Sequence, residues 1–82
     1  MTIGEAYRKA SRELAEKGIP DPKEDACLIL SHLTGLSHME IRLTKAEQVL
    51  STEQEQRLAS LLLSRAQRIP LQYLLGEQWF YG

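Results

Sequence analysis

The chain has 82 residues, of which 43% are hydrophobic and 26% are charged, and its formal net charge is −1 at pH 7. These values are typical of one small globular domain and exclude the disordered, fibrous and membrane classes. They also argue against direct nucleic-acid binding, because domains that bind phosphates normally carry a clear basic excess or stripe.

Cysteine content and the N-terminal sequence bear on the compartment. Cys27 is the single cysteine, so the chain can form neither an internal disulfide nor a multi-cysteine metal site. The first residues lack the basic-then-apolar pattern of a signal peptide, and no apolar run approaches the roughly 18 residues of a membrane helix. We therefore expect a reducing, cytoplasmic location and no membrane partner.

The first helix is expected to begin near Ile3, because Thr2 and Glu5 have the S/T-x-x-E spacing of a capping box. Gly18 is expected to end it in the left-handed conformation. Apolar residues recur on one helical face between these limits: Ile3, Ala6, Tyr7, Ala10 and Leu14.

The second helix is expected to begin after Asp21, an N-cap acceptor, with Pro22 at a position where its missing N–H costs nothing. It should run to about Thr34 and end at Gly35. A wide apolar face predicts that this helix is the central one; the face consists of Ala26, Cys27, Leu28, Ile29, Leu30 and Leu33.

Two more capping signals follow closely, Ser37 with Glu40 and Thr44 with Glu47. They predict two short helices, at about 39–42 and 45–48. The apolar residues of this stretch are expected to fill the core of the bundle: Met39, Ile41, Leu43, Val49 and Leu50.

A last long helix is expected at about 52–68, opened by Ser51 with Gln54. Pro70 can start one more helical turn that Gly76 closes, and residues 77–81 have the composition of extended chain. The inward face of the long helix should hold Leu58, Leu61, Leu62, Ala66 and Ile69. The predicted fold is therefore all-α, a small bundle of about five helices that ends in the start of a linker strand.

The sequence offers no catalytic constellation. It contains His32, His38 and Cys27 but no Gly-rich phosphate or dinucleotide loop. Helical histidines without a partnered carboxylate or cysteine seldom perform chemistry, and a lone cysteine is commonly a small core residue. We assign no catalytic, cofactor-binding or metal-ligating residue.

Charge and aromatic residues concentrate toward the end of the chain. Residues 56–76 hold three arginines and no acid, and three of the five aromatic residues lie in the last four positions. Arg65 and Arg68 either offset the negative end of a helix dipole or face a neighbouring domain or protein. The aromatic residues either cover the bundle or pack against a further part of the protein, and we expect the second.

Two stretches together resemble a known family. The first is Asp25-Ala26-Cys27-Leu28-Ile29-Leu30-Ser31-His32-Leu33-Thr34-Gly35. The second is Arg65-x-x-Arg68-x-Pro70-Leu71-Gln72-Tyr73-Leu74-Leu75-Gly76-x-x-x-Phe80-Tyr81-Gly82. Both resemble the PrmC/HemK proteins, bacterial methyltransferases of peptide-chain release factors, and their order and separation make the match specific. Together with the order and lengths of the helices, the resemblance covers essentially the whole chain.

The resemblance implies that residues 1–75 form a helical N-terminal domain that recognises the substrate, and that residues 76–82 begin an interdomain linker or β-hairpin. A Rossmann-like catalytic domain, which binds S-adenosylmethionine in the family, is absent from this chain. Family members methylate the glutamine amide nitrogen in the Gly-Gly-Gln motif of release factors. The family's Asn-Pro-Pro-Tyr motif does not occur here, so we expect this fragment alone to be inactive and to bind no cofactor.

The resemblance also implies two partners, the class 1 peptide-chain release factors and the chain's own C-terminal catalytic domain. Phe80 matches a family position that borders the pocket for the substrate glutamine, although Trp79 replaces the acid that usually precedes it. The candidate partner or interdomain contacts are Arg65, Arg68, Gln72, Tyr73, Trp79 and Phe80.

Two other functions remain open. A stand-alone helical adaptor would bind a partner protein through the aromatic end, and a reading frame that continued past Gly82 would argue against it. A small helical DNA-binding module would need a basic exposed helix face, which the mixed charges of the first two helices do not supply.

Overall fold

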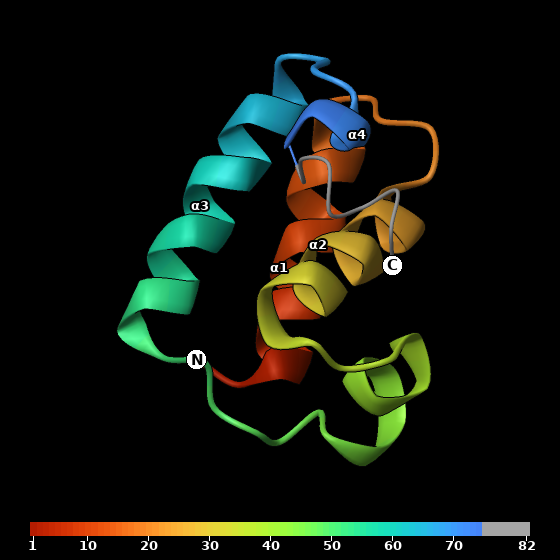
Figure 1. Ribbon diagram of the computed structural model, residues 1–82. Helices are drawn as coiled ribbons and strands as arrows, with labels where there is room; N and C mark the ends of the chain where they lie inside the picture. The colour runs from red at the N-terminus through yellow and green to blue at the C-terminus, as the bar shows by residue number, and fades with distance from the viewer. Residues whose placement is uncertain (75–82) are drawn as a thin grey trace.

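The computed structural model describes residues 1–74. The described part is helical, which confirms the all-α class, and Figure 1 shows α1, α2 and α3 packed into a bundle. η1 lies at the end of the bundle where α1 begins, and α4 lies at the end where α1 finishes (Figure 1). The elements are α1 (Ile3–Glu16), α2 (Pro22–Thr34), the π-helical turn η1 (Glu40–Thr44), α3 (Thr52–Ala66) and α4 (Leu71–Leu74). The predicted linker strand and the role of Gly76 lie outside the described residues.

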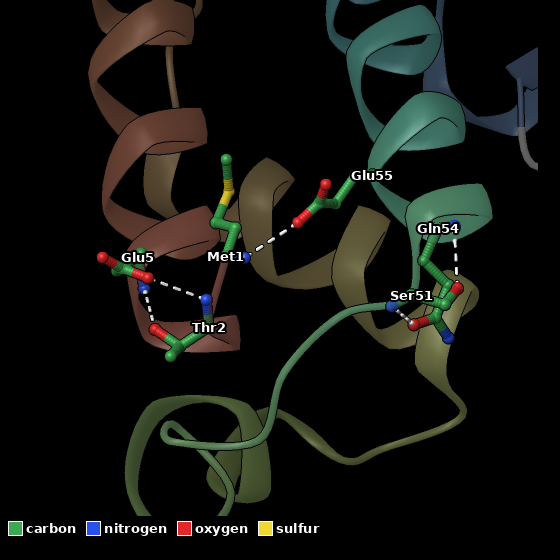
Figure 2. A network of polar contacts seen from close by, with 6 residues as sticks. All are labelled: Met1, Thr2, Glu5, Ser51, Gln54 and Glu55. Atoms are coloured by element: carbon green, nitrogen blue, oxygen red, sulfur yellow. Dashed lines mark hydrogen bonds and ion pairs between the residues drawn. The ribbon is translucent and has the colours of Figure 1, made fainter.

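Both long helices that were expected to open with a capping box do so. Glu5 donates its backbone N–H to Thr2 Oγ1 at 3.1 Å, and Thr2 donates its own to Glu5 Oε1 at 2.8 Å. Ser51 and Gln54 repeat this exchange at the start of α3, at 3.1 and 2.9 Å (Figure 2). The N-terminal amine of Met1 donates to Glu55 Oε2 at 2.9 Å, which ties the start of the chain to α3.

The start of α2 differs in one detail from the prediction. The helix begins at Pro22, but Asp21 makes no side-chain cap hydrogen bond. Its backbone, at φ −122° and ψ 70°, departs from the extended conformation that the two other caps adopt, with ψ near 160°. Gly18 is left-handed as predicted, with φ 77°. Gly35 ends α2 as predicted, and it is also left-handed, with φ 76°.

The core lies between α1, α2 and α3. α2 packs against α1, α3 and η1, and α1 has the same set of neighbours, so the two helices share the centre of the bundle. The buried apolar residues are Ile3, Ala6, Ala10, Leu14, Ile19, Ala26, Cys27, Ile29, Leu30, Ile41, Leu50, Leu58 and Leu62. Leu33 and Leu61, both expected inside, are partly buried against this core.

Of the two short helices predicted between α2 and α3, the first formed and the second did not. Ser37 and Glu40 do form their capping box, with bonds of 2.9 and 3.2 Å, and η1 follows it. After Thr44 the chain turns, and Val49 pairs with Thr2 in an isolated antiparallel bridge.

Backbone pairing with the start of α1 explains this difference. The carbonyl oxygens of Ala46 and Gln48 accept hydrogen bonds from the N–H groups of Gly4 and Ile3, each at 2.8 Å. The first N–H groups of a helix have no partner within the helix, so this segment satisfies them from outside. The bundle therefore contains one short helical turn in this region instead of two, and the expected count of about five helices is not confirmed.

The same region fills the core less than predicted. Ile41 and Leu50 are buried, whereas Met39, Leu43 and Val49 are 66%, 73% and 66% exposed. Ile41 points inward from η1, so Met39 and Leu43, two positions away on either side, face away from the core. Met39 and Leu43 therefore present apolar side chains at the surface beside η1.

α3 ends at Ala66, two residues before the expected limit. Arg68 has φ 71°, which is left-handed and rarely adopted by a residue other than glycine. This backbone conformation ends the helical run and turns the chain toward α4.

Candidate partner-binding surfaces

Arg65 is held inside the bundle by a buried ion pair. Its Nε donates to Asp25 Oδ2 at 2.7 Å, and the two side chains are only 18% and 10% exposed. Its Nη1 also donates to the carbonyl oxygen of Ile69 at 3.4 Å. Arg65 therefore connects the end of α3 to the first turn of α2.

Asp25 is the buried charged residue of the described chain, and the sequence analysis assigned it no role of its own. The available signal was its position four residues before Ile29, on the helix face that enters the core. An acid on such a face requires a partner, because burying a charge without one is costly. Its partner lies forty residues further along the chain, which the sequence pattern does not reveal.

Arg68 is exposed and reaches another helix end. Its Nη2 donates to the carbonyl oxygen of Lys17, the residue that caps α1, at 3.2 Å. The guanidinium of Arg68 thus lies at the negative end of the α1 dipole, whereas the sequence suggested that it would act on the end of the long helix that precedes it. Arg65 and Arg68 together hold the ends of three helices at the side of the bundle where α4 begins.

The remaining predicted contact residues follow Arg68. Tyr73 lies on α4 and is 75% exposed. Gln72 lies on the same short helix, whereas Trp79 and Phe80 lie outside the described residues. Arg68 and Tyr73 are thus accessible to a partner, and Arg65 is largely withdrawn from the surface.

The titratable side chains of the described chain do not gather into a reactive site. Cys27 is 2% exposed, and burial raises the pKa of its thiol, which keeps it protonated and unreactive. His38 Nδ1 lies 3.9 Å from Glu24 Oε1, beyond hydrogen-bond distance. Within residues 1–74 no group of three or more histidine, cysteine or acidic side chains could hold a metal ion.

A second surface, which the sequence analysis missed, crosses α1, the first turn of α2 and η1. It is a hollow of about 500 Å³ whose lining holds four basic residues and no acid. We call it the basic groove; its lining consists of Tyr7, Arg8, Ser11, Arg12, Ala15, Pro22, Lys23 and Arg42. Arg8 and Arg12 stand four residues apart on α1, a spacing visible in the sequence, but Lys23 and Arg42 join them only through the fold.

An apolar surface adjoins the basic groove. Met39 and Leu43 line a neighbouring hollow of about 380 Å³ together with His38 and Arg42. Arg42 therefore belongs to both hollows, and we call the pair Met39 and Leu43 the apolar shelf.

The described part of the chain is a small all-α domain with two candidate contact surfaces. No helix within residues 1–74 is long and apolar enough to cross a membrane. The PrmC N-terminal domain family matches residues 5–76, and the chain belongs to this family. This finding confirms the resemblance drawn from the two sequence stretches.

Curated relatives agree with the family match. The chain is 34% identical over 80 residues to a release factor glutamine methyltransferase of Deinococcus radiodurans. This alignment covers 96% of the chain and 28% of the relative. It is 37% identical over 76 residues to a release factor glutamine methyltransferase of Corynebacterium glutamicum, and this alignment covers 93% of the chain and 25% of the relative. It is 35% identical over 68 residues to a release factor glutamine methyltransferase of Homo sapiens, and this alignment covers 82% of the chain and 20% of the relative. The chain thus spans about a quarter of the length of these relatives, and no solved structure matches it significantly.

Proposed function

We propose that the chain is the N-terminal release-factor-recognition domain of a cytoplasmic methyltransferase that acts in translation termination. The enzyme would use S-adenosylmethionine to methylate the glutamine of the Gly-Gly-Gln motif in class 1 peptide-chain release factors. The observation that carries the proposal is the family match over residues 5–76, together with relatives named release factor glutamine methyltransferases. Residues 1–75 would form the recognition domain, and residues 76–82 would begin the linker or β-hairpin to the catalytic domain.

The residues of this chain do not fit a site for S-adenosylmethionine. The sequence has no Gly-rich loop, and the described part has no strand from which such a loop could lead into a helix. Cofactor binding and methyl transfer are therefore assigned to the catalytic part of the enzyme, and no residue of this chain is given a role in the chemical step.

The contribution of this domain to the reaction would be substrate binding away from the reacting nitrogen. A large protein substrate gains positioning from contacts remote from the reaction centre, and this binding energy helps to assemble the reactive geometry. Arg68, Gln72, Tyr73, Trp79 and Phe80 remain proposed contacts to the release factor or the catalytic domain. The ion pair with Asp25 favours a positioning role for Arg65, because it joins the end of α3 to the first turn of α2.

A chimeric enzyme tests the proposal. We would join this chain to the catalytic part of the Deinococcus radiodurans relative at the aligned boundary, and compare it with that catalytic part alone. Two substrates separate recognition from catalysis: an intact class 1 release factor and a short peptide that contains Gly-Gly-Gln. The recognition domain should raise kcat/KM for the intact protein by about tenfold or more, equivalent to about 1.4 kcal/mol.

The short peptide serves as the internal control, because it cannot reach a surface remote from the catalytic site. Both enzymes should methylate it at the same rate, which also shows that the catalytic part is folded without this chain. Equal kcat/KM values for the intact release factor with and without this chain would refute the recognition role.

A further inference from the structure

We propose that the basic groove and the apolar shelf together bind an acidic segment of the substrate protein that carries an apolar anchor residue. This inference rests on the proposed function, because it locates the recognition surface and specifies the chemistry of the segment recognised. The groove lies across α1, α2 and η1, and neither Arg65 nor Arg68 is among its lining residues.

Uncompensated positive charge is the first observation. Four of the eight groove residues are basic and none is acidic, although the whole chain has a net charge of −1. None of the four forms an ion pair with an acid within residues 1–74. A concentration of like charge in a concave surface focuses the electrostatic potential and attracts a partner of opposite sign.

Two acids close to groove residues in the chain, Glu5 and Glu24, do not pair with the groove cations. Glu5, one turn before Arg8, accepts the backbone N–H of Thr2 in the α1 capping box. Glu24 follows Lys23, and its Oε1 lies 3.9 Å from His38 Nδ1. Hydrogen bonds with Thr2, and also the charge of Arg8, lower the pKa of the Glu5 carboxyl. The groove cations nevertheless form no ion pair within the described residues and can bind carboxylates supplied by another molecule.

Apolar surface is the second observation, and it favours a protein over a nucleic acid. Tyr7, Ala15 and Pro22 contribute apolar lining to the groove, and Met39 and Leu43 extend this surface beyond Arg42. Exposed apolar side chains that adjoin a charged rim are characteristic of protein interfaces. Single-stranded nucleic acid would instead require aromatic platforms on which its bases stack, and Tyr7 is the one aromatic residue of the two hollows.

The electrostatic part is tested with a matched pair of triple variants. Arg8→Gln/Arg12→Gln/Lys23→Gln removes three charges from the groove. Lys17→Gln/Lys45→Gln/Arg57→Gln removes three exposed charges from positions that do not line it. The two variants have the same net charge, so only the location of the loss differs between them.

Binding of each 82-residue variant to a purified class 1 release factor would be measured by isothermal titration calorimetry at low and high salt. The groove variant should raise Kd by about tenfold or more at low salt, and its Kd should depend less on salt than that of the unmodified chain. The control variant should change Kd less than about threefold, a difference of under 1 kcal/mol by the same conversion. Circular dichroism should show equal helical content for all three chains.

The apolar shelf has a separate test. Met39→Ser/Leu43→Ser changes two side chains that are already 66% and 73% exposed, so the fold should not depend on them. This variant should raise Kd several-fold while leaving its salt dependence unchanged. Loss of salt dependence in the shelf variant, or unchanged affinity, would contradict the role assigned to the shelf.

Two outcomes would overturn the groove proposal while leaving the proposed function intact. The first is a chimeric enzyme whose kcat/KM for the release factor needs this chain but is unaffected by the groove substitutions. The second is tight, strongly salt-dependent binding of a single-stranded RNA oligonucleotide that competes with the release factor, which would assign the groove to nucleic acid. If the chain itself proved dispensable for kcat/KM, the proposed function would fall first.

Discussion

Removal of the carboxylate of Asp25 should destabilise the domain more than any single surface substitution. The Asp25→Ala change leaves the Arg65 guanidinium without its partner at 2.7 Å, in a site where the arginine side chain is only 18% exposed. Breaking a buried ion pair from one side typically costs about 3–5 kcal/mol. Because both side chains retain some contact with water, we expect the lower part of this range, about 3 kcal/mol.

That loss is large for a domain of this size. Stabilities of about 0.05–0.15 kcal/mol per residue give roughly 4–12 kcal/mol for this chain. For a small domain each kcal/mol corresponds to about 4–8 °C in Tm, so Asp25→Ala should lower Tm by more than about 12 °C. Urea and thermal unfolding of the 82-residue chain, followed by circular dichroism, would measure both quantities.

A double-mutant cycle at Asp25 and Arg65 separates the energy of the ion pair from the other effects of Asp25 on stability. One such effect is the favourable position of an acid in the first turn of α2. The apolar replacement Asp25→Leu/Arg65→Met should recover much of the loss, because no unpaired charge remains. Glu13→Gln is the control, since it breaks the surface pair between Lys9 and Glu13, whose 3.7 Å contact joins side chains 49% and 43% exposed. That change should cost less than about 0.5 kcal/mol. A similarly small cost for Asp25→Ala would refute the view that this pair connects α2 and α3.

Two further predictions concern the helix starts and the buried thiol. Thr2→Ala and Ser51→Ala should each lower the free energy of unfolding by about 1 kcal/mol, because each removes the acceptor of a capping box; Thr52→Ala, just inside α3, is the control, and equal effects at Thr52 and Ser51 would contradict the assignment. Cys27 should react with iodoacetamide far more slowly in the folded chain than in urea, because burial raises the pKa of its thiol. Because the thiol pKa is raised, the folded state binds this proton more tightly than the unfolded state does. The resulting stabilisation is fully present below the ordinary thiol pKa and is lost as pH rises through the raised pKa. A free energy of unfolding that increased with pH across this alkaline range would contradict the prediction.

Most features set by neighbouring residues were predictable from the sequence, although the side-chain cap expected at Asp21 did not form. The capping boxes at Thr2 and Ser51, the left-handed turn at Gly18 and the end of α2 at Gly35 all formed as expected. Each depends on contacts within about one helical turn, so the spacing of residue types is sufficient to indicate it.

Features set by distant segments were not predictable in the same way. The pattern of Thr44 with Glu47 indicated a helix, but the carbonyl oxygen of Ala46 is used by the N–H of Gly4, forty-two positions earlier. Tertiary pairing overrides local preference in such cases. The basic groove has the same origin, since only the packing of η1 against α1 and α2 brings Arg42 to the residues on those helices.

The two predicted contact arginines acquire different roles once the packing is known. Arg65 joins α3 to α2 through Asp25, and Arg68 joins the turn after α3 to the end of α1 through the Lys17 carbonyl. Both contacts fix the start of α4 relative to the helices that carry the basic groove. A substrate protein bound at the groove can be positioned for a distant reaction only if the intervening structure is rigid, because small errors of placement greatly reduce the rate. The value of Arg65 to recognition would therefore come from the rigidity of this connection rather than from contact with the partner.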